Sequence, residues 1–172
     1  MEDKFPPVLD VCCGSRMFWF DKEDDRVIFL DKRQLSIKID IGTPGTKGRK
    51  PIDVFPNIQG SFTSLPFRDN TFLHVVFDPP HLFEKAGTGI ISLKYGKLPG
   101  AWENEIRKGF HECFRVLTPG GTLIFKWSAI EIPISNILKL IPYRPLYGHR
   151  SGKKSNTHWV AFIKHLDNKK NE

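Results

Sequence analysis

Short runs of β-branched and aromatic residues alternate with longer segments along this chain, and that alternation is the strongest constraint on its fold. The segment at 102–117 carries apolar residues at three- and four-residue steps and stops before Pro119-Gly120-Gly121, as an amphipathic helix does. Strands that alternate with helical segments favour a mostly parallel sheet with helices on both faces, which binds ligands beyond the carboxyl ends of its strands. The expected strands lie at residues 8–11, 27–30, 52–55, 73–77, 122–126 and 157–163.

A single domain is expected, because 172 residues can bury a core without disulfides or metals. We assign residues 1–166 to this domain and expect the basic, polar tail at 167–172 to be disordered. Lysine and arginine outnumber aspartate and glutamate by 26 to 19, and the formal charge of +7 favours a polyanionic partner. Part of the positive charge lies in a Gly- and Lys-rich stretch at 42–50, which we expect to be a loop.

Three cysteines, Cys12, Cys13 and Cys113, supply neither a disulfide framework nor the paired Cys-x-x-Cys motifs of a zinc site. We therefore expect a reducing compartment and no metal. No apolar run approaches the length needed to cross a bilayer, so we expect a soluble, cytoplasmic protein. Adjacent cysteines behind an apolar strand are expected to be small packing residues rather than reactive thiols.

The tetrapeptide Asp78-Pro79-Pro80-His81 follows the apolar run at 73–77 directly. Each proline fixes φ and lacks an N–H, which leaves the carbonyls of Asp78 and Pro79 free to accept hydrogen bonds from outside the sheet. A carboxylate and acceptor carbonyls at a strand end suit a planar amine. A Pro-Pro pair by itself is also an ordinary strand terminator, so its meaning depends on the other motifs of the chain.

The first strand-to-helix turn reads Asp10-Val11-Cys12-Cys13-Gly14-Ser15, followed by an expected short helix or turn at 15–22. It lacks the three spaced glycines of a nicotinamide site, and no phosphate-binding lysine loop is present in the sequence. Further landmarks follow in order: Asp31, the stretch at 65–72, the Asp78 tetrapeptide and the stretch at 115–123. In this arrangement the chain resembles class I S-adenosylmethionine-dependent methyltransferases, most closely the amino-methylating branch. The stretch at 149–159 also resembles the closing hairpin of small stand-alone members encoded by phages and bacteria.

The resemblance implies a single-domain α/β, Rossmann-like methyltransferase fold, with a mostly parallel sheet and a closing antiparallel hairpin strand. It also implies S-adenosyl-L-methionine as cofactor. The family places an acidic residue before the stretch at 65–72 to hold the adenine, whereas this chain has Ser61 and Phe62 there, which become the candidates for that contact. The cofactor-binding residues that the resemblance implies are Asp10, Cys12, Cys13, Gly14, Asp31, Ser61, Phe62 and Asp78.

The reaction that the resemblance implies is methyl transfer to an exocyclic amine of a nucleobase in DNA or RNA. The Asp78 carboxylate and the Pro79 carbonyl would localise the amine lone pair by accepting its hydrogen bonds. The candidate catalytic residues are Asp78, Pro79, Pro80 and His81. His81 stands where the family has an aromatic residue, and it could stack on a base, hydrogen-bond to it or cap the loop.

Substrate contacts are expected from the loops at 82–100 and 144–156, whose aromatic and basic residues suit phosphates and unpaired bases. Trp127 and Trp159 flank strand positions and are expected in the core. Two other functions stay open: a methyltransferase for a small metabolite, and a cofactor-binding interaction protein without catalysis. The candidate substrate-binding residues are His81, Phe83, Lys126, Arg150, Lys153 and Lys154.

Overall fold

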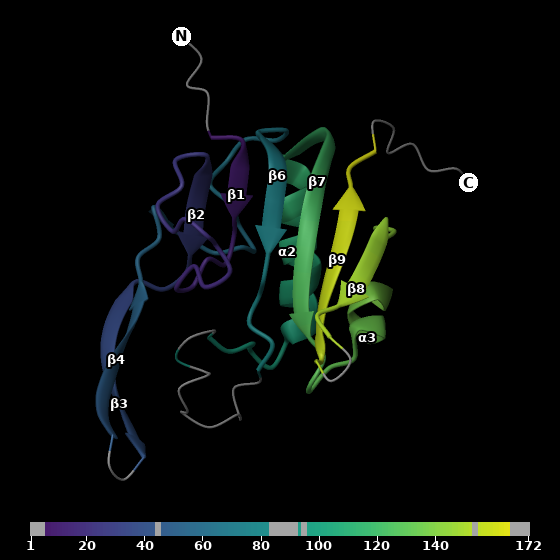
Figure 1. Ribbon diagram of the computed structural model, residues 1–172. Helices are drawn as coiled ribbons and strands as arrows, with labels where there is room; N and C mark the ends of the chain where they lie inside the picture. Colours follow the sequence, from purple (N-terminus) through teal and green to yellow (C-terminus); the bar gives the residue numbers. More distant parts are fainter. Residues whose placement is uncertain (1–5, 44–45, 83–92, 94–95, 153–154, 166–172) are drawn as a thin grey trace.

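A seven-stranded sheet forms the centre of the computed structural model, which describes residues 6–43, 46–82, 93, 96–152 and 155–165. The strand order is β5-β2-β1-β6-β7-β9-β8 (Figure 1). The first five of these strands run parallel, and β9 and β8 close the sheet in antiparallel pairing, so the predicted sheet is confirmed. The strands of the sheet are β1 (Val8–Asp10), β2 (Val27–Asp31), β5 (Ile58–Gln59), β6 (Phe72–Phe77), β7 (Leu117–Ser128), β8 (Tyr147–Arg150) and β9 (Thr157–Ile163).

A separate two-stranded ribbon, β3 (Leu35–Thr43) and β4 (Thr46–Val54), projects from one side of the sheet (Figure 1). The strand expected at 52–55 is confirmed through Val54 as the end of β4, although it lies in this ribbon and not in the central sheet. The loop expected at 42–50 was wrong, because most of that stretch is strand. The glycines and lysines of that stretch suggested a loop. The backbone at 46–50 nevertheless pairs with the end of β3, where isoleucines alternate with other residues as in a strand.

Two helices, α2 (Trp102–Val116) and α3 (Ile134–Lys139), contribute to one large core on the same face of the sheet. The apolar stripe of α2 brings the ring of Phe110 against Phe77 of β6 and Phe125 of β7, with centroids 5.4 and 4.8 Å apart. Gly109 allows this close approach, because a Cβ atom there would lie 2.6 Å from the Phe77 ring. The predicted helix is confirmed, and it ends where β7 begins.

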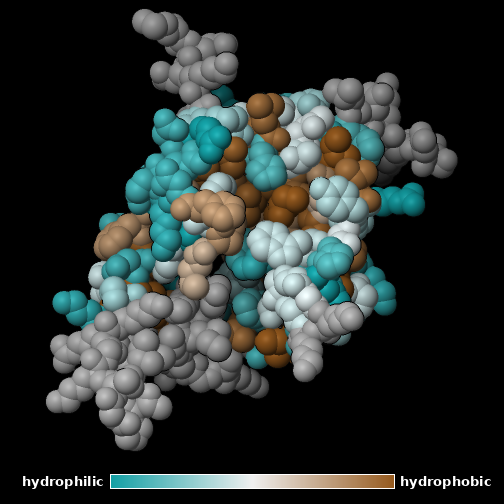
Figure 2. Space-filling view, viewed as in Figure 1, coloured by the Kyte–Doolittle hydropathy of each residue, from teal (hydrophilic) through white to brown (hydrophobic). Residues whose placement is uncertain are grey.

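The opposite face of the sheet carries no helix among the described residues, whereas we expected helices on both faces. The segment at 15–22 consists of turns, and Arg16 has a φ of 51°, a left-handed conformation that a helix excludes. From this segment Trp19 packs edge-on against Phe29, with ring centroids 5.2 Å apart. Apolar side chains are visible across the face in Figure 2, and Leu73 and Tyr147 are 61% and 67% exposed.

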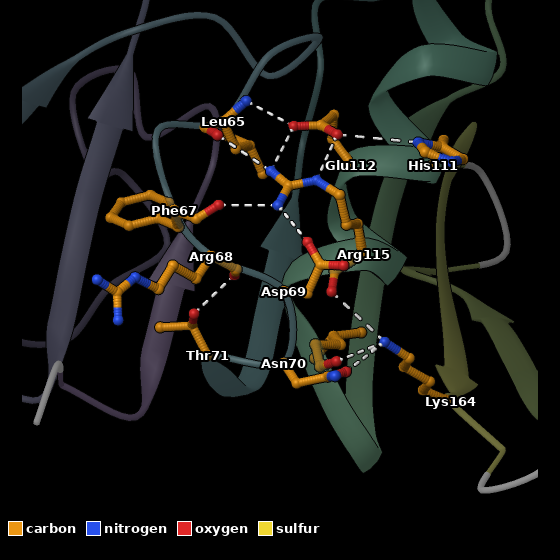
Figure 3. A network of polar contacts seen from close by, with 11 residues as sticks. Leu65, Phe67, Arg68, Asp69, Asn70, Thr71, His111, Glu112, Arg115 and Lys164 are labelled. Atoms are coloured by element: carbon orange, nitrogen blue, oxygen red, sulfur yellow. Dashed lines mark hydrogen bonds and ion pairs between the residues drawn. The ribbon is translucent and has the colours of Figure 1, made fainter.

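A network of polar contacts ties the start of β6 to the last turn of α2 (Figure 3). The Arg115 guanidinium donates to Glu112, to Asp69 and to the carbonyls of Leu65 and Phe67 at 2.7 to 3.0 Å. Glu112 also accepts from the Leu65 amide at 2.7 Å, and Arg115 holds the pKa of Glu112 below its ordinary value. The stretches at 65–72 and 115–123, which contributed to the resemblance, therefore brace the fold at the end of β6 opposite to Asp78.

Within the described part of the chain, no helix is both long enough and apolar enough to span a bilayer.

Candidate active site

A cavity of about 440 Å³ opens beyond the carboxyl ends of β1, β2, β6 and β7. Its walls come from the first turn of the chain, from the end of β2, from the segment after β5 and from the Asp78 motif. Nearly all of the residues that we expected at the cofactor site meet here, although they lie far apart in sequence. The predicted residues that line the cavity are Cys12, Cys13, Gly14, Asp31, Ser61, Phe62, Asp78, Pro80 and Lys126.

Asp31 holds the first turn in place at one side of the cavity. The Gly14 amide donates to Asp31 Oδ2 at 2.9 Å, and Arg33 donates to Asp31 Oδ1 from its amide at 2.9 Å and from Nε at 3.1 Å. Gly14 has a φ of 50°, which glycine adopts without a steric penalty. The Asp31 side chain is 6% exposed, so a carboxylate is fixed next to a close backbone turn.

Ser61 and Phe62 lie on the cavity wall where the adenine contact was expected. Phe62 packs against Phe77, with ring centroids 5.3 Å apart, and Ser61 Oγ lies 2.8 Å from Thr63 Oγ1. The wall here is therefore an apolar ring beside a hydroxyl pair, with no carboxylate among these residues.

Asp10 does not line the cavity, although we expected it to anchor the methionine end of the cofactor. Its carboxyl group is fully buried and accepts hydrogen bonds from Trp19 Nε1 at 2.8 Å and from the Cys12 amide at 3.1 Å. Burial raises the pKa of Asp10 to about 7, against the opposing effect of these two bonds. In this structure Asp10 shapes the turn that carries Cys12 and Gly14.

Asp78 closes the cavity on the β6 side, and its carboxylate is paired with Lys126 from the neighbouring strand β7. Lys126 Nζ donates to Asp78 Oδ2 at 2.5 Å, and the two side chains are 20% and 10% exposed. Burial raises the pKa of Asp78, while the charge and the hydrogen bond of Lys126 lower it. Pro79 is buried and Pro80 lines the cavity. Because proline has no N–H, these two residues can only accept hydrogen bonds through their backbone.

His81 is not among the residues that line the cavity; its ring stands edge-on to Trp127, with centroids 6.4 Å apart. Burial lowers the pKa of His81, and the positive charge of Lys126 lowers it further, so the imidazole is neutral at pH 7. Trp127 is fully buried and donates from Nε1 to the Ile132 carbonyl at 2.8 Å, which confirms its predicted place in the core.

Two aromatic residues that sequence reasoning did not assign to the site surround Lys126. The ammonium lies 5.3 Å from the ring centre of Phe18 and 5.6 Å from that of Trp159, and these two rings meet edge-to-face at 5.7 Å. The core position predicted for Trp159 was wrong: its side chain is only partly buried and donates to Ser151 Oγ. The β7–β9 register pairs Lys126 with Trp159, a relationship that no local sequence pattern announces.

The remaining predicted substrate residues lie elsewhere. Arg150, on β8, donates from Nε and Nη2 to the Ser155 carbonyl at 3.1 and 2.8 Å and does not line the cavity. Phe83, Lys153 and Lys154 lie outside the described residues.

No protein-family model matches the chain, and no curated protein is detectably similar to it in sequence. Solved structures do resemble it. The PH0226 protein from Pyrococcus horikoshii OT3 superimposes with a TM-score of 0.52 at 15% identity, over 91% of this chain and 81% of the other. The 1,6-didemethyltoxoflavin-N1-methyltransferase of Burkholderia thailandensis, solved with 1,6-didemethyltoxoflavin and S-adenosylhomocysteine, gives a TM-score of 0.52 at 13% identity, over 92% and 70% of the two chains. The chain has a Rossmann-like methyltransferase fold.

In this Rossmann-like methyltransferase fold, the cavity lies where the strand order reverses. The chain passes from β1 to β2 on one side and later returns to β6 on the other, so the crevice beyond β1 is a topological switch point. The turn at Cys12 to Gly14 follows β1, Asp31 ends β2, and Asp78 follows β6. The three strand ends thus bring the Cys12–Gly14 turn, Asp31 and Asp78 to one crevice.

Proposed function

We propose that this protein is an S-adenosyl-L-methionine-dependent methyltransferase that methylates an exocyclic amine of a nucleobase. The observation that carries the proposal is the position of Asp78: its carboxylate, followed by Pro79 and Pro80, faces the same cavity as the Cys12–Gly14 turn and Asp31. A group that can hold an amine and groups that can hold the cofactor therefore share one space.

The residues of the cavity fit the proposed cofactor. Its volume of about 440 Å³ is within the range of small-molecule sites. Asp31 can accept hydrogen bonds from vicinal hydroxyls, Gly14 allows close approach of the backbone, and Phe62 offers an apolar surface to a flat ring. When bound, the cofactor would supply an electrophilic methyl group on a positively charged sulfur.

Asp78 and Pro79 supply acceptors for the amine. An exocyclic amine is a weak nucleophile because its lone pair is delocalised into the ring, and hydrogen bonds donated to a carboxylate and a carbonyl localise that pair. The acceptors are preorganised, because Asp78 is largely buried and Pro79 has a fixed φ. Transfer would form the bond from the amine nitrogen to the methyl carbon as the bond from that carbon to sulfur breaks, and the proton then lost by the nitrogen would pass to the Asp78 carboxylate or to solvent.

The residues in and near the cavity favour a nucleic acid as the substrate. Phe18 and Met17 line the cavity, and Trp159 stands beside Lys126. Phe20, two residues after Phe18 in the sequence, is fully exposed. Exposed aromatic rings bind unpaired bases by stacking, and the net charge of +7 favours phosphates. A base from a duplex would have to be extruded to reach Asp78.

A methyltransferase for a small heterocycle is the second candidate. One solved structure with this fold carries the name of an N1-methyltransferase of 1,6-didemethyltoxoflavin, a small heterocycle. The cavity of this chain is lined by both Asp78 and Phe18, which could hold the amine and the ring of either substrate.

Radiolabelled cofactor decides between these candidates. The protein is incubated with tritiated S-adenosyl-L-methionine and separate pools of DNA, RNA and small heterocyclic amines, with the Asp78→Ala variant as control. Label in a nucleic acid, dependent on Asp78 and lost as salt rises, is the expected result. Label in the small-molecule pool alone would favour the second candidate, and no Asp78-dependent transfer to any pool would refute both.

A further inference from the structure

Asp78 and Lys126 present a hydrogen-bond acceptor and a donor side by side on one wall of the cavity. Their polar atoms are 2.5 Å apart, and both residues line the cavity. An Asn or Gln side chain also presents an oxygen and an N–H at one edge, and that pair binds the amine and the neighbouring ring nitrogen of adenine. Asp78 and Lys126, which come from adjacent strands, likewise place an acceptor oxygen beside an N–H donor.

Building on the proposed function, we infer that Lys126 determines specificity by donating to an unprotonated ring nitrogen beside the amine held by Asp78. The substrate class is therefore an aminated heterocycle in which a ring nitrogen with a free lone pair lies on the same edge as the amine. Adenine and cytosine both have this edge. An amine without such a neighbour satisfies Asp78 but leaves the Lys126 donor without its substrate partner.

The position of Lys126 suits such a contact. The β6–β7 register pairs Phe77 with Phe125, so the next residues, Asp78 and Lys126, lie level on neighbouring strands. The ammonium is further restrained by the faces of Phe18 and Trp159. A lysine is otherwise a flexible point charge, and these contacts reduce the entropy that it loses when it binds a substrate.

Burial distinguishes this role from long-range steering of an anion. A steering cation works best at the surface, whereas the Lys126 side chain is only 20% exposed. The ammonium donates to Asp78 Oδ2. Among the described residues, no donor reaches Asp78 Oδ1, so this oxygen can accept from the amine while Oδ2 keeps Lys126 in place.

The first experiment removes the donor from the protein and the acceptor from the substrate separately. Initial rates of wild type and Lys126→Met are compared on the base that wild type methylates and on its deaza analogues, 1- and 7-deazaadenine or 3-deazacytosine, within the same oligonucleotide. For wild type, kcat/KM is expected to be about 10- to 100-fold lower on one analogue than on the parent base. For Lys126→Met, kcat/KM is expected to be low on the parent base and equally low on that analogue. Lys139→Met, which removes an exposed charge from α3, is the matched control.

A binding experiment tests the inference even if no nucleic acid is methylated. Neutral 2-aminopyridine, which has the amine and the adjacent ring nitrogen, is titrated against aniline, which has the amine alone, with the cofactor site saturated by sinefungin. We expect wild type to prefer 2-aminopyridine by about 10-fold and Lys126→Met to show no preference. The role of Lys126 would be overturned if wild type bound both compounds with equal affinity. It would also be overturned if the deaza substitution lowered kcat/KM of Lys126→Met by the same factor as that of wild type. Absence of methyl transfer to every nucleic acid would instead refute the proposed function.

Discussion

Lys126 on β7 and Asp78 after β6 form an ion pair of 2.5 Å in which both side chains are largely removed from water. Each residue alone would be a buried charge, which is costly, and together they keep a carboxylate and an ammonium at the wall of the cavity. Burial raises the pKa of Asp78, and the charge and hydrogen bond of Lys126 oppose that rise, so the pair favours the carboxylate form of a largely buried group. Its consequences can be measured in the free protein and during catalysis.

Asp78→Ala should reduce methyl transfer by at least about 100-fold, because it removes a preorganised acceptor of the amine. Cofactor affinity, measured by calorimetry, should stay nearly unchanged, since Asp31 and the Gly14 turn are untouched. The variant leaves Lys126 without its carboxylate and should unfold more easily, so the double variant Asp78→Ala/Lys126→Met serves as the folding control. An active Asp78→Ala enzyme would disprove the assignment.

Lys126→Met should shift the acidic limb of the pH–rate profile to higher pH. Burial raises the pKa of Asp78 and Lys126 lowers it, so removal of the lysine raises that pKa further. As pH falls, the carboxylate is then protonated earlier and stops accepting hydrogen bonds from the amine. The profile of kcat/KM is compared with that of Lys139→Met, and an unshifted acidic limb would contradict the electrostatic part of the argument.

Asp10→Asn should change how stability depends on pH. Burial raises the pKa of Asp10 from 3.8 to about 7, so between these pH values the folded state binds a proton that the unfolded state releases. Wild-type stability therefore falls as pH rises through this window, by up to about 4 kcal/mol for this group. Asparagine cannot titrate but can still accept from Trp19 Nε1. Denaturant unfolding from pH 4 to 8 should show a smaller decline in Asp10→Asn; parallel curves would refute the prediction.

Arg115→Met should destabilise the protein by about 2–4 kcal/mol, because the carbonyls of Leu65 and Phe67 lose their side-chain donor and Glu112 keeps only the Leu65 amide. Arg107→Met on the same helix removes an exposed guanidinium and should cost less than about 0.5 kcal/mol. Both variants are compared by urea unfolding. Equal stabilities would mean that the network in Figure 3 does not brace the fold.

Local sequence determined the elements whose signals are short-range. The apolar stripe of α2 and the run of β-branched and aromatic residues at 157–163 predicted a helix and a strand that the structure places within one residue of the expected ends. The Asp78 motif could also be placed at a strand end, because a proline pair has no N–H to extend a ladder. These features depend on residues that are neighbours in the chain.

The tertiary structure decided which side chains meet. The β6–β7 and β7–β9 registers bring Lys126 to Asp78 and Trp159, while the buried turn after β1 directs Asp10 to Trp19 and away from the cavity. Likewise, the Gly- and Lys-rich stretch became a strand because a partner strand satisfied its backbone groups. Periodicity along a segment specifies an element and its buried side, but the partner of a buried charge depends on strand register and packing between residues that are distant in the sequence.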